Sequence, residues 1–99
     1  MADTVPVVLL VEDERHIRRF LRTSLEAEGW RVFEAETLRQ GLVDAATRKP
    51  DLVIADLGLP DGDGVDLIRE LRTWSSVSAI VLSARSGEGD KVRAVSHRL

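Results

Sequence analysis

Three short apolar runs constrain the fold of this 99-residue sequence more than any other feature. They lie at Val7–Val11, Leu52–Ala55 and Ala79–Leu82, and apolar residues follow one another in each without alternation. A continuous apolar run of this length is typical of a strand that is buried on both faces. Because parallel sheets are usually covered by helices on both faces, the runs predict a parallel sheet in an α/β domain.

Helical periodicity fills the segments between these runs. Apolar residues recur at helical spacing in three segments, at Ile17, Phe20, Leu21 and Leu25, then at Leu38, Leu42, Ala45 and Ala46, and finally at Val65, Ile68 and Leu71. The first helix is expected to end at Gly29. The second begins with the capping-box spacing of Thr37 and Gln40 and stops before Pro50. Residues 30–35 predict a shorter strand nearer the sheet edge.

Alternating strands and helices joined by short links predict βαβ units and a doubly wound parallel sheet. We expect one domain over residues 1–99, since nothing in the sequence indicates a second core. The last segment, Asp90–Leu99, is expected to begin a further helix with Val92 and Val95 facing inward.

Polar residues follow the predicted strands at the end where function gathers in such sheets. Glu12 and Asp13 follow the first apolar run, Asp56 closes the second, and Ser83 follows the third. Ligands of open parallel sheets bind beyond the carboxyl ends of the strands, where the winding changes direction. These four side chains are therefore expected to converge.

Three carboxylates at one place indicate a bound cation, because they repel one another unless a positive charge neutralises them. Mg²⁺ prefers oxygen ligands and often shares one or two carboxylates with a phosphate group. An Asp beside Mg²⁺ can attack phosphorus and form an acyl phosphate, which is the role expected for Asp56. The Ser83 hydroxyl can then donate a hydrogen bond to a phosphoryl oxygen.

Three motifs in chain order resemble the receiver domains of two-component response regulators. They are VEDE at 11–14, DLVIADLGLPDGDG at 51–64 and VLSAR at 81–85. The resemblance implies a flavodoxin-like sheet with strand order 2-1-3-4. The stretches IRRFLRTSLEAEGWRVFEAETL and ATRKPDL further resemble the OmpR-like regulators of potassium-uptake operons.

Carried over position by position, the resemblance implies a phosphoacceptor at Asp56 and a Mg²⁺ ligand at Asp13. It makes Glu12 an acidic partner that acts through water, the Gly58 carbonyl a further ligand, and Ser83 the switch hydroxyl, with the small Ala84 leaving room for the phosphoryl group. The implied donor is a phosphohistidine of a partner sensor histidine kinase. The domain would be a signalling module that catalyses its own phosphorylation and no other reaction.

The sequence departs from the family at its C-terminal end. The family has a fifth strand, which ends in a phosphoryl-binding Lys, and a fifth helix, and the chain stops at Leu99 before either. Lys91 does not replace that Lys, because it falls where the fourth helix should begin. We therefore expect a domain that is incomplete at its C-terminus and lacks the DNA-binding domain of OmpR-like regulators. The strand at Ala79–Leu82 would be an unpaired edge that favours a homodimer.

Other functions fit the residues less well. A phosphatase of the haloacid dehalogenase type needs a second Asp two residues after its nucleophile, and Gly58 stands there. The segment from Asp61 to Asp66 resembles a calcium loop, but Val65 and Arg72 replace oxygen ligands. A pseudo-receiver that docks or dimerises without phosphorylation stays open, because the family's Lys is missing.

Several residues also have plainly structural interpretations. Asp13 and Asp63 each precede a predicted helix and could serve only as N-caps. The arginines at positions 15–22 are expected to form a solvated helix face, and Trp30 and Trp74 to cover helix ends as packing.

Composition and charge exclude some classes of partner. The 17 acidic and 14 basic residues leave a net charge of −3, which gives no electrostatic footprint for nucleic acid. No Cys is available for a disulfide framework. The run at Val7–Val11 is too short to span a bilayer, and no basic segment with a long apolar core marks a signal peptide. These features predict a cytoplasmic protein.

Overall fold

The computed structural model describes residues 5–84 and 92–97, with only the backbone described for residues 83, 84 and 92–97. Its strands are β1 (Val7–Val11), β2 (Arg31–Ala35), β3 (Leu52–Asp56), β4 (Ser78–Ala84) and β5 (Val92–His97). Its helices are α1 (Arg15–Ala27), α2 (Leu38–Arg48) and α3 (Gly64–Leu71). None of these described helices has the length and apolar character that crossing a membrane requires.

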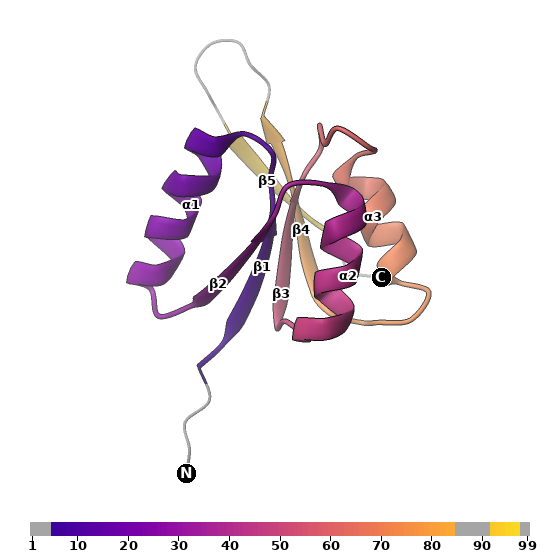
Figure 1. Ribbon diagram of the computed structural model, residues 1–99, viewed down its shortest axis with the longest axis horizontal. Coiled ribbons are helices and arrows are strands. Elements are labelled where there is room, and N and C mark those ends of the chain that lie inside the picture. The colour runs from indigo at the N-terminus through magenta and orange to yellow at the C-terminus, as the bar shows by residue number, and fades with distance from the viewer. Residues whose placement is uncertain (1–4, 85–91, 98–99) are drawn as a thin grey trace.

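The sheet has the strand order β2-β1-β3-β4-β5, and its first four strands are parallel. The predicted order 2-1-3-4 is thus confirmed. Figure 1 shows α1 on one face of the sheet, with α2 and α3 together on the other. The winding changes direction between β1 and β3, so the carboxyl ends of these two strands form the switch point of the fold.

Side chains on the central strands alternate between two apolar clusters. On β1, Leu9 and Val11 face α2 and α3, whereas Val8 and Leu10 face the side of α1. All four are fully buried, which explains why the run has no polar position. The sequence prediction of a sheet covered on both faces is confirmed.

Carboxylates are the N-caps of α1 and α3, whereas Thr37 is the N-cap of α2. Glu14 caps α1 by accepting hydrogen bonds from the amides of His16 and Ile17, so Asp13 is not the N-cap. Asp63 caps α3 through the amides of Val65 and Asp66. The N-cap interpretation is therefore right for Asp63 and wrong for Asp13, which is left free for another role.

The final described segment differs from the sequence prediction. Residues 92–97 form β5, antiparallel to β4, where we expected a helix with Val92 and Val95 inward. The i, i+3 spacing of two valines is weak evidence for a helix. The free edge of β4 offers a row of backbone hydrogen-bonding groups that a strand can satisfy. The prediction that β4 forms the unpaired edge is also wrong, because β5 occupies that position; Lys91 and Leu99 lie outside the described residues.

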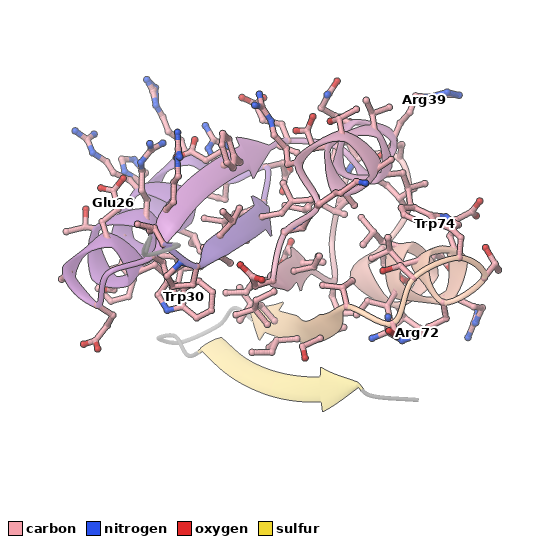
Figure 2. All side chains as sticks on the ribbon, turned by 90° about the horizontal axis from the view of Figure 1, so that it is seen from below. Glu26, Trp30, Arg39, Arg72 and Trp74 are labelled. Carbon is pink, nitrogen blue, oxygen red and sulfur yellow. The ribbon has the colours of Figure 1, made fainter. Side chains whose placement is uncertain are left out.

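Some side chains also lie elsewhere than predicted. Phe20 is 67% exposed, because α1 turns by about 100° per residue and the stripe that faces the sheet runs through Leu21 and Leu25. Trp30 packs beside the same cluster, as predicted, but Trp74 is 50% exposed. Figure 2 looks from below at the edge where the parallel strands begin, and both tryptophans are labelled there on opposite faces of the sheet.

Candidate functional site

The register of the sheet brings the ends of β1 and β3 together. Val11 of β1 pairs with Ala55 of β3. Glu12 follows Val11 and Asp56 follows Ala55, so these two acids lie side by side at the carboxyl edge of the sheet. Glu12, Asp13 and Asp56 each offer a carboxylate oxygen, and these oxygens all lie within 4.8 Å of one another. The predicted convergence of the three acids is therefore found in the structure.

Glu12 is the most buried of these acids, with only 1% of its surface exposed. Its Oε2 accepts a hydrogen bond from the Glu14 amide at 2.9 Å, while Oε1 is buried without a partner. Burial, joined by the nearby charges of Asp56 and Asp13, raises the pKa of Glu12 to about 7 against the opposing effect of the Glu14 hydrogen bond. A buried carboxylate oxygen without a partner is costly unless a cation or proton satisfies it.

Asp56 closes β3 and is 7% exposed. Its Oδ2 accepts a hydrogen bond from the Gly58 amide at 3.1 Å. Burial raises the pKa of Asp56, and the charge of Asp13 adds to this effect, while hydrogen bonds from the amides of Gly58 and Leu57 oppose it. The carboxylate is thus held in place on one side and crowded by negative charge on the other.

A glycine lets α3 begin directly beside the end of β3. A Cβ atom at Gly64 would lie 2.8 Å from the Asp56 carbonyl oxygen and 3.0 Å from that of Ala55. Any larger residue would push the helix away from the strand that carries Asp56. No distinct sequence signal marks Gly64, since it is one of three glycines in residues 57–64.

The donor set fits a hard divalent cation. All three candidate ligands are carboxylates, two of them buried, and one buried oxygen has no other partner. Burial first, and mutual repulsion second, raise the pKa values of Glu12 and Asp56. Mg²⁺ binds such oxygen donors and would favour their charged forms. Glu12, Asp13 and Asp56 are the residues that would hold it.

The remaining predicted site residues lie at the same edge. Gly58 is two residues beyond Asp56, and a Cβ atom there would lie 3.7 Å from Asp56 Oδ2. Ser83 follows Leu82, whose backbone pairs with Asp56, so the Ser83 backbone is next to the site. The Ser83 hydroxyl and the side chain of Ala84 lie outside the described residues.

Arg18 is a site neighbour that sequence reasoning missed. The arginines of α1 were predicted to be a solvated face, but the Arg18 side chain is 13% exposed and lies against β2. Its Nη1 donates a hydrogen bond to the Glu12 carbonyl oxygen at 2.9 Å. Its partner Glu34 stands 16 residues away, and no local pattern links two positions so far apart.

Comparison with known proteins agrees with this geometry. Residues 8–99 match the family described as response regulator receiver domain. The chain is 70% identical over 88 residues to the KDP operon transcriptional regulatory protein KdpE of Escherichia coli (strain K12), which covers 89% of this chain and 39% of that protein. It is 46% identical over 89 residues to the transcriptional regulatory protein KdpE of Mycobacterium tuberculosis, covering 90% and 39%.

A solved structure shows the same fold. The MaeR response regulator bound to beryllium trifluoride superposes with a TM-score of 0.75 at 31% identity, covering 82% of this chain and 69% of that one. The chain spans about two fifths of the length of the two KdpE proteins that it matches. Since the matched segment includes all of the described strands and helices except Val7, and all three clustered acids, the chain belongs to the response regulator receiver domain family.

Proposed function

We propose that this chain is a phosphoacceptor receiver, and that Asp56 takes a phosphoryl group with Mg²⁺ bound beside it. The observation that carries the proposal is the cluster of Glu12, Asp13 and Asp56 around the buried end of β3. A cluster of acids that raises the pKa of its own members is unfavourable for folding alone. Binding of a cation and a phosphoryl group would explain why such an unfavourable cluster is present.

In the proposed reaction, a carboxylate oxygen of Asp56 attacks the phosphorus of a phosphohistidine. An O–P bond forms and the P–N bond breaks, and the imidazole leaves with that electron pair and takes up a proton from solvent. The Gly58 amide holds Oδ2 of Asp56 at 3.1 Å, which fixes the rotation of the carboxylate. Oδ1 is then the oxygen that attacks.

Bound Mg²⁺ would neutralise the acids and the charge on the equatorial phosphoryl oxygens. Asp13 is exposed and not engaged as a helix cap, so it is suited to direct ligation. Glu12 has one carboxylate oxygen tied to the Glu14 amide, which leaves Oε1 for the cation or for a water bound to it. The Gly58 carbonyl is the fourth proposed ligand.

Ser83 is proposed as the hydroxyl that binds the transferred phosphoryl group, and Ala84 as the small residue that leaves space for it. Supporting this, the β4 backbone pairs with Asp56 one residue before Ser83. A hydrogen bond from Ser83 would link phosphorylation to the end of β4, where a shift can spread to neighbouring elements.

The wider role concerns a longer protein. The matched relatives are named as transcriptional regulators, and this chain covers 39% of each. We propose that this protein acts in the cytoplasm and that a KdpD-like sensor histidine kinase is its phosphoryl donor. The parent protein would control transcription of potassium-uptake genes through a DNA-binding domain outside residues 1–99.

A docking or dimerisation module without phosphorylation is the second candidate. The observation that favours it is β5, which runs antiparallel to β4 and stands at the edge of the sheet with one side of its backbone unpaired within the described sheet. A strand edge of this kind can pair with a second copy. Analytical ultracentrifugation at rising protein concentration tests this proposal. A sedimentation coefficient that stays at the monomer value would contradict dimerisation.

The phosphoacceptor function is tested by incubating the chain with acetyl phosphate and Mg²⁺ and measuring the intact mass. Wild-type protein is expected to gain one phosphoryl group, and the gain should disappear with EDTA. Asp56→Asn is expected to gain none. Asp44→Asn on α2 should be labelled like wild type, because the Asp44 side chain accepts a hydrogen bond from Gln40 on the same helix and is not part of the acidic cluster. Labelling that persists in Asp56→Asn would contradict the proposal.

A further inference from the structure

Arg18 connects the acidic site to the neighbouring strand through all three nitrogens of its guanidinium group. Nε binds Glu34 Oε1 at 3.0 Å, Nη1 donates to the Glu12 carbonyl oxygen at 2.9 Å, and Nη2 lies 3.5 Å from Glu36 Oε2. Glu34 belongs to β2 and Glu36 follows it. The planar group is therefore held between the end of β2 and the first residue after β1.

The backbone turn after β1, which carries Glu12 and Asp13, is also held by a hydrogen bond from an amide group. The Glu12 amide donates to the Ala35 carbonyl oxygen at 3.0 Å, so the backbone of Glu12 is bound at both its amide and its carbonyl. The Glu12 side chain is bound as well, through the Glu14 amide. Removing the Arg18 contact would free the peptide that joins Glu12 to Asp13, the two acids that the turn presents.

We propose that Arg18 is a positioning residue for the metal site, acting through the Glu12 carbonyl to fix the turn that carries Glu12 and Asp13. The inference rests on the proposed function, since it concerns how that site binds Mg²⁺. Residues that orient metal ligands commonly change metal affinity by about 10- to 100-fold when they are replaced. A surface ion pair would have no such effect.

Arg22 provides a matched control one helical turn away. It shares the partner Glu34, with Nη1 at 2.6 Å from Oε2, and also pairs with Glu26. None of its hydrogen bonds or ion pairs involves Glu12 or Asp13. Replacing either arginine removes an ion pair between α1 and β2, but only replacement of Arg18 removes the bond to the turn.

The experiment is calorimetric titration of the 99-residue chain with Mg²⁺, comparing wild type, Arg18→Met and Arg22→Met. Arg18→Met is expected to raise the Kd for Mg²⁺ by about tenfold or more, whereas Arg22→Met should change it less than about twofold. Amide hydrogen exchange without Mg²⁺ gives a second readout. Exchange at Asp13 and Glu14 should quicken relative to the β3 amides in Arg18→Met alone.

Equal Kd values for wild type and Arg18→Met, or equal shifts in both variants, would overturn the inference and leave the proposed function intact. A wild-type chain that binds no Mg²⁺ would overturn both. If Arg18→Met does not fold, Arg18→Lys and Arg22→Lys replace the two methionine variants. Lysine keeps the positive charge but lacks the planar guanidinium that binds several partners at once. Arg18→Lys is then expected to weaken Mg²⁺ binding more than Arg22→Lys, and the reverse order would overturn the inference.

Discussion

Glu12 is buried, and its pKa of about 7 leaves it partly protonated in the folded protein near neutral pH. Its pKa of about 7 lies above the ordinary value of 4.5, so between these pH values the folded protein is protonated at Glu12 while the unfolded chain has lost the proton. The folded state therefore binds more protons, and its stability falls as pH rises through this window. The loss is complete above pH 7 and absent below pH 4.5.

Replacing Glu12 by Gln should remove this penalty. In Mg²⁺-free buffer, Glu12→Gln is expected to unfold at a higher urea concentration than wild type at pH 8, with a gain on the order of 3 kcal/mol. The difference should shrink at pH 5, where Glu12 is protonated in the folded wild type. Urea titrations at the two pH values check this, and a gain that does not depend on pH would contradict the assignment.

At the scale of elements, α2 packs against β1 through a glycine. A Cβ atom at Gly41 would lie 2.9 Å from Leu67 Cδ1 and 2.9 Å from Val11 Cγ2, so helix and strand meet where no side chain intervenes. Gly41→Ala is expected to destabilise the chain by about 1 to 3 kcal/mol despite the better helix propensity of alanine. Gln40→Ala, at an exposed neighbouring position, should stay within about 0.5 kcal/mol. Denaturant unfolding distinguishes the two.

The loop after Asp56 is fastened to α2 by Asp61. Its Oδ1 and Oδ2 accept hydrogen bonds from the amides of Leu38 at 2.7 Å and Arg39 at 3.1 Å, and these bonds hold the pKa of Asp61 below its usual range. A lowered carboxyl pKa adds stability above the unfolded pKa that is lost as pH falls through the folded one. Arg39, labelled in Figure 2, is the second residue of α2, the helix that this loop contacts.

Removing that carboxylate should loosen the start of α2 before anything else. Asp61→Ala is expected to speed amide exchange at Leu38 and Arg39, while Asp44→Ala on the same helix should leave these two amides unchanged. Exchange measured by nuclear magnetic resonance at neutral pH checks this. Protection that survives at both amides in Asp61→Ala would contradict this, because Thr37 accepts a hydrogen bond from the Gln40 amide and not from these two.

Elements with strong local signals were predictable from the sequence. Both sides of the strand at Val7–Val11 are apolar because both are buried, and caps such as Thr37 lie next to the helices they begin. The strand β5 was not predictable, since its pairing depends on the free edge of β4 and not on its own spacing. Arg18 was predicted wrongly as part of a solvated face, and the contact of Asp61 with α2 was not predicted. Their partners lie 16 and 23 residues away in the chain, beyond the reach of local patterns.

For the whole molecule, metal binding and folding should be linked. A ligand that binds only the folded state stabilises it by about 2.7 kcal/mol at roughly 100 times its Kd. Mg²⁺ is therefore expected to raise the Tm of wild-type protein, and to have little effect on Asp13→Asn, which removes an exposed member of the acidic cluster. Asp44→Asn should respond like wild type. Thermal denaturation monitored by circular dichroism at several Mg²⁺ concentrations checks this, and equal responses in all three proteins would place the cation elsewhere.

The candidate site was more predictable than its surroundings. Glu12, Asp13 and Asp56 could be assigned to one place because parallel strands end at a common edge, whatever the helices between them do. The degree of burial could not be predicted in the same way. That Glu12 is sealed from solvent while Asp13 is exposed depends on how the turn after β1 is folded, and contacts from β2 and α1 determine this.

The positions of the two tryptophans determine what the intrinsic fluorescence of this protein can report. Trp30 follows α1 and Trp74 follows α3, so each stands where a helix has run back from the acidic edge to the opposite end of the sheet. Neither indole neighbours the carboxylates, and the two occupy different faces (Figure 2). A change in fluorescence on metal or phosphoryl binding would therefore report a structural change that reaches the opposite end of the sheet.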